Sequence, residues 1–495
     1  MAVNQRLENL RIVFEPKSIA FVGATETRGK WGFIIPNNLI NGGYNGRLFP
    51  VNPNRPRVFG LDAYRSVKEI SDNVDLAVIT VPARLVPSTV EDCVDKGIRA
   101  GVVISAGFKE LGQEGALLEQ QMITIAKRGN MVLIGPNGQG VCCPENHLFA
   151  WMPMDYHPPA GKVAVVSQSG NIQLLLIAGL VNTGFGVSKS VSSGNEADLR
   201  IDDYVEYFAE DDMTEVILCY VEGMNYGREF ARRARDAAMK KPVVLIKGGT
   251  TSSGVLAATS HTGAIAVSGQ LFDAVCRQSG VIQACRLDEA SLIAASFLNR
   301  PLPRGRRVAI VTGGGGLGVV AADWCTKLGL EVVRLSDKTL SAIGQHMPAW
   351  WVPGNPVDMV ATGTSHIVVP LADILMKSGE VDAILFLLMG PPPKENALQT
   401  GATDRDSWNW KEIFELAMLF LEVLYELMNQ HAIPVYMVST LLNDQILTIR
   451  DRLGDKFWAL QPTIETAAIC MKAMADYASF LGKARGEAGM GSSIC

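Results

Sequence analysis

Short apolar runs alternate with helical segments along most of the chain. In the first third, each run is followed by a turn of small residues and then by a stretch with helical periodicity. Such runs are typical of strands that are buried on both faces. Strands that alternate with helices predict a parallel, doubly wound α/β sheet. The predicted strands of this block cover residues 18–22, 47–51, 76–81, 100–104 and 132–134.

The same alternation continues in two further blocks. A proline-rich link at residues 152–159 and a basic link at 299–306 separate the blocks. At roughly 100–200 residues per domain, a chain of 495 residues suits about three domains. The sequence therefore predicts an α/β protein of three consecutive domains with parallel sheets, over residues 1–150, 160–298 and 305–482.

The composition excludes several classes of protein. Hydrophobic residues make up 48% of the chain and charged residues 19%, which is enough apolar material for large cores. The formal net charge of −5, without any basic block, argues against a nucleic-acid partner. No apolar run reaches the roughly 18 residues of a membrane helix, and the first residues lack a signal-peptide core. We expect a soluble cytoplasmic protein that does not bind membranes.

The nine cysteines show no pattern of a metal site or of a disulfide framework. They are scattered, no C-x-x-C pair occurs, and the adjacent Cys142 and Cys143 suit neither a routine disulfide nor zinc. Reduced thiols in a cytosolic protein are the expectation, and no metal site is predicted.

The carboxyl ends of the first predicted strands carry small residues and prolines. Doubly wound sheets bind their ligands at this edge. Each of these turns alone is ordinary turn chemistry, but several of them on one edge favour a ligand site. The residues are Gly23, Ala24, Thr25, Asn52, Pro53, Val81, Pro82, Ser105, Ala106 and Asn137.

The first of these turns leads into a predicted helix, whose free amides and dipole suit an anion. The turn does not read G-x-G-x-x-G, and no carboxylate follows at the spacing that holds a ribose. An NAD site is therefore disfavoured, and with it a nicotinamide-dependent dehydrogenase.

These loops together resemble the CoA-binding domain of the ADP-forming acyl-CoA synthetases, which are relatives of succinyl-CoA synthetase. The resemblance implies a Rossmann-like domain whose loops hold coenzyme A. It implies that Lys30 and the neighbouring turn meet the phosphates, and that the proline-bearing loops meet the adenine and the pantetheine. The family usually continues its Gly-Pro-Asn segment with Cys and then Leu or Pro. This chain instead has Gly138 and Gln139 where the thiol end of CoA would arrive.

A single histidine stands out in the second block. His261 lies between small and hydroxyl residues, just before a helical run. A neutral imidazole is nucleophilic at pH 7, and its phosphoryl adduct keeps a high transfer potential, so a phosphoryl carrier is one interpretation. A turn histidine held by hydrogen bonds is the other.

Two further features of this block suit a phosphoryl carrier. Ser169, Gly170 and Asn171 form a small-residue turn between a strand and a helix, which binds phosphate or simply caps the helix. Glu222 follows the predicted strand 215–221. A carboxylate there can accept a hydrogen bond from an imidazole and fix its tautomer, or it is a solvated strand-end residue.

The third block repeats the phosphate-binding pattern. Gly315 and Gly316 belong to a run of four glycines between a strand and a helix. Asn355 and Asp358, on a loop rich in proline and glycine, either bind a small acid, orient the glycine turn or form an Asn-Pro turn. Residues 389–410 are predicted to be a long exposed loop, for which we favour a subunit contact over a lid or a plain insertion.

The second and third blocks also resemble the same synthetases, so that the resemblance spans about residues 10–480. The matching segments are 167–170, 195–198, 220–223 and 260–264, in the family's order and spacing. The resemblance implies two flavodoxin-like ligase domains after the CoA-binding domain. It implies that His261 is the phosphorylated histidine and Glu222 its stabilising carboxylate. It also implies that a second phosphate-binding helix, at Gly315, faces the first.

These synthetases also need an ATP-grasp module, and the three predicted domains use up the length of the chain. The sequence therefore resembles an α-type subunit, with ADP or ATP and Mg²⁺ on a β-type partner. The implied reaction converts acyl-CoA, ADP and phosphate reversibly to a small organic acid, ATP and CoA. A hetero-oligomer is expected, or a homodimer when the chain is alone. The alternative is a regulatory CoA-binding protein without turnover, which would need neither His261 nor Glu222.

Overall fold

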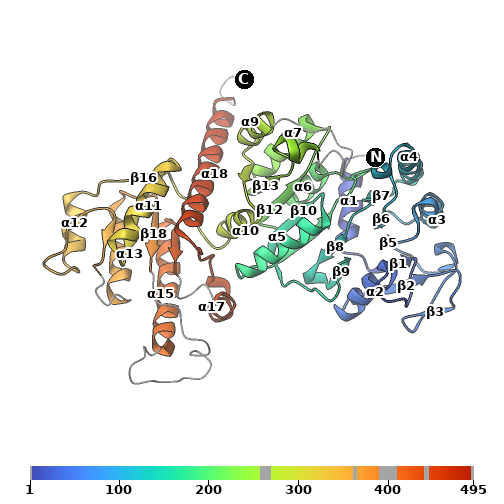
Figure 1. Cartoon of the computed structure of the whole chain (residues 1–495), viewed down its shortest axis with the longest axis horizontal. Helices are drawn as coiled ribbons and strands as arrows, with labels where there is room; N and C mark the ends of the chain where they lie inside the picture. Colours follow the sequence, from blue (N-terminus) through green and yellow to red (C-terminus); the bar gives the residue numbers. More distant parts are fainter. Residues whose placement is uncertain (1–2, 257–268, 361–364, 389–409, 440–444, 492–495) are drawn as a thin grey trace. The chain divides into compact units, whose positions relative to one another are not determined.

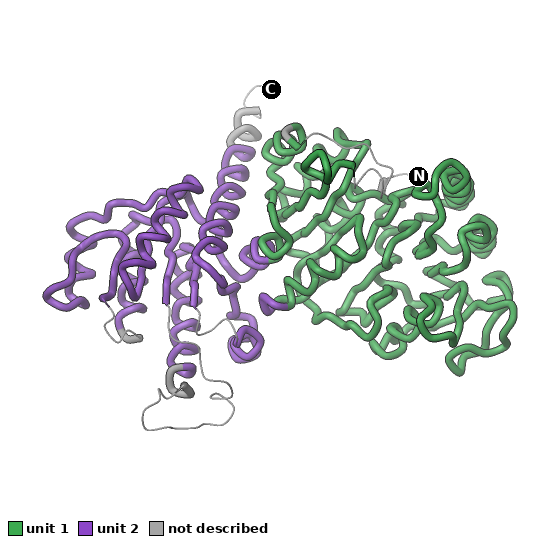
Figure 2. Tube along the Cα trace, in the orientation of Figure 1, with its two compact units in different colours: residues 1–181, 185–291 green, residues 182–184, 292–495 purple. Residues whose placement is uncertain are grey.

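The computed structural model describes residues 3–256, 269–360, 365–388, 410–439 and 445–491. The chain divides into two compact units (Figure 2). Unit 1 comprises residues 1–181 and 185–291, and unit 2 comprises residues 182–184 and 292–495. The first two predicted blocks thus fall together in unit 1, and the third block falls in unit 2.

The first sheet of unit 1 is parallel throughout and has the strand order β2-β1-β5-β6-β7 (Figure 1). Every residue of β1, β5, β6 and β7 is buried, as the apolar runs predicted. The elements are β1 (Ser18–Val22), α2 (Trp31–Asn41), β2 (Arg47–Val51), β5 (Leu76–Ile79), α3 (Val86–Lys96), β6 (Ala100–Val103), α4 (Gln113–Arg128) and β7 (Val132–Ile134), with the small hairpin β3 (Arg57–Val58) and β4 (Leu61–Asp62) after β2.

The second sheet of unit 1 has the order β14-β13-β12-β10-β11-β8-β9. Strands β10 to β14 are parallel, whereas β8 and β9 form an antiparallel hairpin against β11. Helix α1 (Val3–Phe14) contacts strands of both sheets. The other elements are β8 (Gly140–Cys143), β9 (Leu148–Trp151), β10 (Ala160–Ser167), α5 (Gly170–Asn182), β11 (Val187–Ser192), α6 (Ile201–Glu210), β12 (Val216–Val221), α7 (Gly227–Ala238), β13 (Val243–Lys247), α9 (Gly269–Ser279), β14 (Ile282–Ala284) and α10 (Leu287–Ser296).

Strand β11 was not predicted, because its sequence is polar. All six of its residues are nevertheless buried. Ser188 shares a hydrogen bond with Thr214 at 2.8 Å, and Ser190 accepts one from Gln173 at 2.7 Å. The buried ammonium of Lys189 lies 2.5 Å from a carboxylate oxygen of Asp211. Side-chain partners thus allow a strand that lacks the apolar signature of its neighbours.

The hairpin β8–β9 lies at the end of the predicted first domain, yet it pairs with the second sheet. Cys142 stands opposite Ser190 of β11 in the antiparallel register. The hairpin covers what would otherwise be an open edge of β11. In terms of strand pairing, the last strand of the first sheet is therefore β7, which ends before residue 140.

The cysteines of the described residues are free thiols. Cys142 and Cys143 are both fully buried within this hairpin. Burial raises the pKa of Cys143 to about 11, so this thiol stays protonated at neutral pH.

Unit 2 is built on a parallel sheet with the order β16-β15-β18-β19, and β17 also pairs with β15. The long helix α18 contacts α11, β18 and β19. The elements are β15 (Arg307–Thr312), α11 (Gly315–Lys327), β16 (Glu331–Val332), α12 (Asp337–Gly344), β17 (Val357–Asp358), α13 (Ser365–Ser378), β18 (Ala383–Leu387), α15 (Trp410–His431), β19 (Val435–Val438), α17 (Ile446–Leu453) and α18 (Ile464–Gly491).

The parallel sheets share one topology, which confirms the predicted α/β class. A first strand is flanked by the next strand on one side and by a later strand on the other: β2-β1-β5, β11-β10-β12 and β16-β15-β18. Ligands of such sheets bind where the strand order reverses, beyond the carboxyl ends of the two central strands. A ligand site is therefore expected at these switch points.

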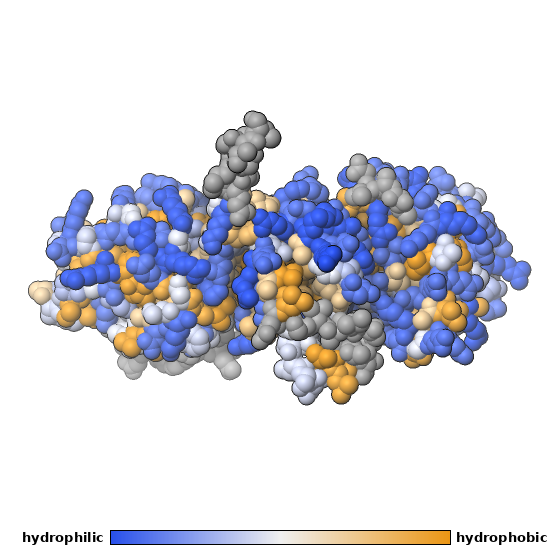
Figure 3. Space-filling view, turned by 90° about the horizontal axis from the view of Figure 1, so that it is seen from above, coloured by the Kyte–Doolittle hydropathy of each residue, from blue (hydrophilic) through white to orange (hydrophobic). Residues whose placement is uncertain are grey.

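Within the described ranges, the structure contains no helix long and apolar enough to span a bilayer. On the face drawn in Figure 3, apolar residues lie in small groups among hydrophilic ones.

Replacement of Gly32 by alanine is expected to destabilise unit 1. Gly32 lies in α2, and an added methyl carbon would be 2.1 Å from the carbonyl oxygen of Gly23. Overpacking of this kind costs about 1–3 kcal/mol, more than the roughly 1 kcal/mol that alanine gains over glycine in a helix. Urea unfolding followed by circular dichroism measures the change.

Gly482→Ala is the matched control, because Gly482 is an exposed helical glycine of α18 with no described atom within 4 Å of the added carbon. This substitution is expected to stabilise the protein by about 0.5–1 kcal/mol. Similar effects of both substitutions would refute the close approach of α2 to the β1 turn.

Candidate functional site

The loops predicted at the edge of the first sheet are joined by hydrogen bonds. The side-chain amide of Asn52 donates to the carbonyl of Ala24 at 2.7 Å, which ties the end of β2 to the turn after β1. The hydroxyl of Thr80 donates to the carbonyl of Val22 at 3.1 Å, which ties β5 to β1. The Gly23 backbone adopts a φ of 97°, and a side chain there would meet Thr80. Glycine is therefore required at this turn.

The same linkage continues to the other end of the sheet. The Ser105 hydroxyl donates to the carbonyl of Val81, and the Asn137 amide donates to the carbonyl of Ser105 at 3.0 Å. Asn137 is held in the left-handed region at a φ of 62°. The structure thus brings the predicted CoA loops together at one edge. Gly23, Ala24, Thr25, Asn52, Val81, Ser105 and Asn137 are buried or partly buried, and Lys30, Pro53, Pro82 and Ala106 are exposed.

The departure at Gln139 has a structural explanation. Its side-chain amide donates to the side-chain oxygen of Asn171 at 2.9 Å. A methyl group on Gly170 would lie 2.0 Å from Cγ of Gln139, so the glutamine packs directly on this glycine. Gln139 therefore joins the loop after β7 to the start of α5, where phosphate binding is predicted.

A second bridge runs from the same loop to the segment between β11 and α6. The amide of Asn195 donates to the carbonyl of Pro136 at 2.8 Å. The side chain of Asn195 donates to Glu110 at 2.6 Å and to Glu119 at 3.1 Å. Burial acts to raise the pKa of Glu110, but hydrogen bonds from Asn195 and from the Gly107 and Phe108 amides lower it overall. The loop after β7, which contains Pro136, is thus held to the second sheet within unit 1.

At the switch point of the second sheet, one buried side chain spans β10 and β12. The side-chain oxygen of Gln168 accepts hydrogen bonds from the amides of Glu222 at 2.6 Å and of Gly223 at 3.1 Å. Its side-chain nitrogen donates to the carbonyl of Gly223 at 2.8 Å. Sequence reasoning did not select Gln168 as a site residue, although its place between Ser167 and Ser169 in the matching segment 167–170 is a usable signal.

Glu222 is a buried residue, 8% exposed, and not the solvated glutamate of the alternative interpretation. The ammonium of Lys247 donates a hydrogen bond to the backbone carbonyl of Glu222 at 2.5 Å. Burial lowers the pKa of Lys247. Burial and the neighbouring Glu222 carboxylate raise the pKa of Tyr220 to about 12. The peptide of Glu222 is therefore held on its N–H side by Gln168 and on its carbonyl side by Lys247.

A second carboxylate, Glu196, lies behind Gln168. It accepts hydrogen bonds from the Ser193 hydroxyl at 2.9 Å, from the Ile201 amide at 3.2 Å and from the Tyr226 hydroxyl. The nearby side chain of Gln168 also acts to lower the pKa of Glu196. Burial of the carboxylate raises the pKa of Glu196 to about 7, against the lowering effect of these hydrogen bonds. Sequence reasoning did not find this residue as a site residue.

The predicted phosphate turn at Ser169 is stabilised locally. The hydroxyl of Ser167 accepts from the amide of Ser169 at 3.1 Å and donates to its carbonyl at 2.6 Å. Helix α5 then begins at Gly170, and Asn171 is exposed. The first amides of a helix have no intrahelical acceptor and suit an anion.

His261 lies outside the described residues, as does the predicted loop up to residue 409. The described chain stops at residue 256, after β13, and resumes with α9 at Gly269. The roles of His261 and of this loop stay predictions.

The glycine turn of unit 2 uses the same local geometry as the serine turn. The hydroxyl of Thr312 accepts from the amide of Gly314 at 3.2 Å and donates to its carbonyl at 2.9 Å. Helix α11 begins at Gly315, and Gly315 and Gly316 are both exposed. A methyl group on Gly315 would lie 3.0 Å from a carboxylate oxygen of Asp358. Asp358 therefore borders the start of the helix.

Asn355 is engaged inside the sheet of unit 2. Its side-chain oxygen accepts from the amide of Ile310, and its nitrogen donates to the carbonyls of Val308 and Val333, each at 2.9 Å. These contacts favour the interpretation that the 355–358 loop orients the glycine turn. A role of Asn355 and Asp358 in binding the acid stays a prediction.

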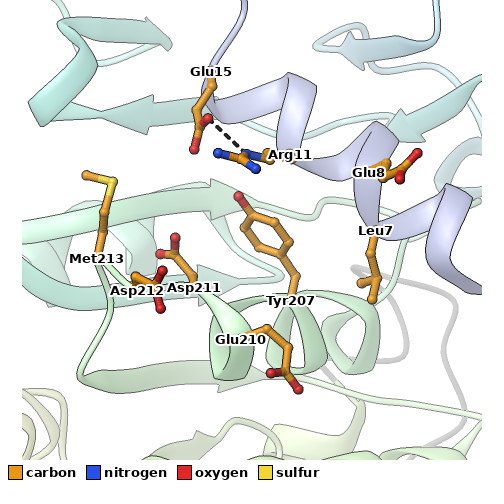
Figure 4. A pocket seen from close by; sticks show the side chains of 9 residues that line it. All are labelled: Leu7, Glu8, Arg11, Glu15, Tyr207, Glu210, Asp211, Asp212 and Met213. Atoms are coloured by element: carbon orange, nitrogen blue, oxygen red, sulfur yellow. Dashed lines mark hydrogen bonds and ion pairs between the residues drawn. The ribbon is translucent and has the colours of Figure 1, made fainter.

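One hollow of unit 1 lies away from these loops. It is lined by α1, α6 and the residues after α6, and the side chains drawn in Figure 4 include five carboxylates. The guanidinium of Arg11 pairs with Glu15 across 3.0 Å. An acidic hollow repels an anionic ligand, so it does not suit CoA or phosphate. No predicted site residue lines it. Among the described residues, no cluster of histidine, cysteine, aspartate and glutamate is fit to hold a metal ion.

Asn355→Ala is expected to lower the free energy of unfolding of unit 2 by about 2–3 kcal/mol, because three backbone groups of the sheet lose their partners. Urea unfolding measures the loss. Asn429→Ala is the control, because the Asn429 amide makes an exposed hydrogen bond within α15. Its effect should stay within about 0.5 kcal/mol. A neutral Asn355→Ala would refute the structural role.

The raised pKa of Glu196 predicts a dependence of stability on pH. In the folded protein the pKa is about 7, and the ordinary value is 4.5. Between these values the folded state holds a proton that the unfolded state has released, so stability falls as pH rises. The slope due to this group is at most about 1.4 kcal/mol per pH unit. Urea unfolding between about pH 5 and about pH 7 tests this, and Glu196→Gln should flatten the slope. An unchanged slope would contradict the raised pKa.

Two models of known protein families match residues that form the carboxyl edges of the two sheets of unit 1. A model described as "CoA binding domain" matches residues 17–144, and a model described as "Succinyl-CoA ligase like flavodoxin domain" matches residues 160–297.

Similar proteins of known name cover most of the chain. The α subunit of acetate–CoA ligase [ADP-forming] II from Pyrococcus furiosus is 36% identical over 86% of this chain and 93% of its own. The α subunit of acetate–CoA ligase [ADP-forming] I from the same organism is 40% identical over 72% of this chain and 78% of its own. Acetate–CoA ligase [ADP-forming] I of Archaeoglobus fulgidus is 40% identical over 76% of this chain, which spans only 54% of that relative.

A solved structure of an acetyl-coenzyme A synthetase is also similar to this chain. Acetyl-coenzyme A synthetase 1 of Ca. Korarchaeum cryptofilum, in complex with phosphate and ADP, matches with a TM-score of 0.82 and 30% identity. The match covers 96% of this chain and 98% of that one.

Proposed function

Because the chain belongs to the family of ADP-forming acyl-CoA synthetases, we propose that it is the α-type component of such an enzyme. It catalyses the reversible conversion of acyl-CoA, ADP and phosphate to a small organic acid, ATP and CoA. The observation that carries this proposal is the Gln139–Asn171 hydrogen bond of 2.9 Å. It joins the edge proposed to hold the thiol end of CoA to the helix start proposed to hold phosphate.

CoA binds at the carboxyl edge of the first sheet. The exposed Lys30 and the start of α2 offer a cation and free amides to its phosphates. The loops that carry Asn52, Pro82 and Ser105 line the rest of the path. Their mutual hydrogen bonds support a preformed site, which lowers the entropic cost of binding.

The reaction proceeds in two transfers. A phosphate oxygen attacks the thioester carbonyl, the C–S bond breaks, and CoA leaves as the thiolate with an acyl phosphate as the product. An imidazole nitrogen of His261 then attacks the phosphorus, the P–O bond to the acyl group breaks, and the acid leaves as a carboxylate. ADP finally takes the phosphoryl group from the histidine to give ATP. Splitting one difficult transfer into such steps is covalent catalysis.

Glu222 orients the imidazole. Its carboxylate accepts a hydrogen bond from the imidazole N–H that does not react, which keeps the other nitrogen free to attack. The burial of Glu222, together with the anchoring of its peptide by Gln168 and Lys247, supports this role. A protein that only bound CoA would have no use for such a carboxylate.

The nucleotide binds to a partner. The relatives from Pyrococcus furiosus carry the name of α subunits, and this chain covers 93% of one of them. We therefore assign ADP or ATP, with Mg²⁺, to a β-type chain of the ATP-grasp class. The assembly is a hetero-oligomer that works on a small organic acid.

Phosphoryl transfer to His261 tests the proposal. The chain is incubated with a β-type partner from its own source, Mg²⁺ and ATP labelled at the γ-phosphate. The chain should take up label that is labile to acid and stable to base, and His261→Asn should abolish it. His346→Asn is the matched control, because His346 is exposed in unit 2 and should leave the labelling unchanged.

Addition of phosphate acceptors completes the test. ADP should remove the label as ATP, and CoA with the acid should remove it as phosphate. A wild-type chain that stays unlabelled beside a β-type chain that binds ATP would overturn the proposal and favour the regulatory CoA-binding protein.

A further inference from the structure

The carboxyl edges of the two sheets of unit 1 are joined by the side chain of Gln139. This residue lies in the loop after β7 of the first sheet, and its amide donates to the side chain of Asn171, in the first turn of α5 on the second sheet, at 2.9 Å. We infer that Gln139 is a specificity-determining residue for the acyl group, which selects acids whose chain carries a hydroxyl or a carbonyl group. This inference rests on the proposed function, in which CoA binds at the first edge and phosphate at the second.

The reaction requires the acyl carbonyl to lie between these two edges. A phosphate oxygen that attacks the thioester must approach the carbonyl carbon to about 3–3.5 Å. The sulfur of CoA reaches this carbon from the loop after β7, and the phosphate reaches it from the start of α5. Gln139 packs on that helix start, because a methyl group on Gly170 would lie 2.0 Å from Cγ of Gln139. The acyl group is therefore adjacent to the Gln139 side chain.

The backbone that carries Gln139 is fixed on both sides. A side chain at Gly138 would lie 2.6 Å from the carbonyl oxygen of Ser192 in β11, and Gly140 adopts a φ of 100° in the left-handed region. The carbonyl of Gln139 accepts a hydrogen bond from the amide of Met152 at 2.9 Å. Gln139 thus presents a single side chain between two glycines. Because its backbone is held before a ligand arrives, little conformational freedom is lost on binding.

The amide of Gln139 keeps hydrogen-bonding capacity for a ligand. A glutamine side chain has two N–H donors and one carbonyl acceptor. Within the described part of the chain, this side chain makes one hydrogen bond, in which one N–H is donated to Asn171. That bond orients the amide and leaves its second N–H and its oxygen to a ligand. Asn171 is exposed and uses its oxygen in the bond, so its own NH₂ group is available at the same place.

An acyl group with a polar substituent matches this pair of amides. A hydroxyl group donates to the oxygen of Gln139 or accepts from either nitrogen, and a carbonyl group accepts from either nitrogen. A plain alkyl chain would displace water from the same groups without replacing its hydrogen bonds, which is unfavourable. A second carboxylate finds no cation in the pair, because both amides are uncharged. The pair therefore favours a hydroxy or oxo acid over an alkyl acid and over a dicarboxylate.

Ratios of kcat/KM between matched acids test the inference. The chain assembled with its β-type partner receives ATP, Mg²⁺, CoA and one acid, and the release of ADP gives the rate. The acids are short aliphatic acids and phenylacetate, each beside its hydroxy, oxo and carboxy derivatives. In the wild type, kcat/KM for at least one hydroxy or oxo derivative should exceed that of its parent acid by about tenfold or more, because the parent leaves the amide groups unpaired. Gln139→Leu should reduce this ratio by about tenfold or more.

The ratio distinguishes substrate contact from a purely structural role of Gln139. A side chain that only braced the loop against α5 would change kcat/KM for every acid by the same factor and leave the ratio unchanged. Gln139→Met keeps the length of the side chain without its amide, should give the same change, and takes the place of Gln139→Leu if that variant does not fold. Gln121→Leu is the matched control, because Gln121 is exposed in α4 and belongs to no proposed site.

Labelling of the chain by ATP separates this inference from the proposed function. That transfer needs neither CoA nor an acid, so Gln139→Leu should still take up label. A wild-type chain that takes up no label would refute the proposed function, and the inference with it. The inference alone would be overturned by a labelled wild type that prefers the parent acid or the dicarboxylate, or that turns over no hydroxy or oxo derivative. An unchanged ratio in Gln139→Leu or Gln139→Met would overturn it as well.

Discussion

Peptide groups at the carboxyl edge of a parallel sheet leave the hydrogen-bonded ladder and must find other partners. At the edge of the second sheet the last paired residues of β10 and β12 are Ser167 and Tyr220. Beyond them the side chain of Gln168 bonds the amide of Glu222 and the carbonyl of Gly223, which directly follow β12. The site thus depends on one amide group that extends a sheet by a single step where the backbone can no longer do so.

The two helix starts obey one local rule in different surroundings. In both, a hydroxyl at the last residue of a strand binds the amide and the carbonyl two residues later, and the helix begins directly afterwards. The start of α5 is bordered by the uncharged amides of Gln139 and Asn171. The start of α11 is bordered by the carboxylate of Asp358. Since a carboxylate offsets the positive end of a helix, the two helix starts differ in the charge they present to an anion.

The sequence predicted those features that depend on local pattern. Apolar runs located most strands, because strands buried on both faces of a sheet are apolar along their length. Small residues after these runs indicated the edge at which we propose that the ligand binds. Strand β11 was not predicted, because its buried serines and lysine find their hydrogen-bonding and ionic partners in side chains distant in sequence, such as Thr214 and Asp211. Gln168 and Glu196 were not predicted as site residues for a related reason. Both residues form hydrogen bonds to residues 30 to 55 positions away, and neither residue has a periodic signature.

The hairpin β8–β9 limits how freely the two halves of unit 1 can be treated as modules. It follows the first sheet in the chain but completes the second, and the recognised CoA-binding segment ends at residue 144, between its two strands. A fragment cut there would carry away one strand of the hairpin and leave β11 with an open edge above a buried lysine. A chimera of two relatives joined at that boundary would therefore pair β8 of one relative with β9 and β11 of the other. A chimera that exchanges one sheet must keep the hairpin β8–β9 together with the second sheet.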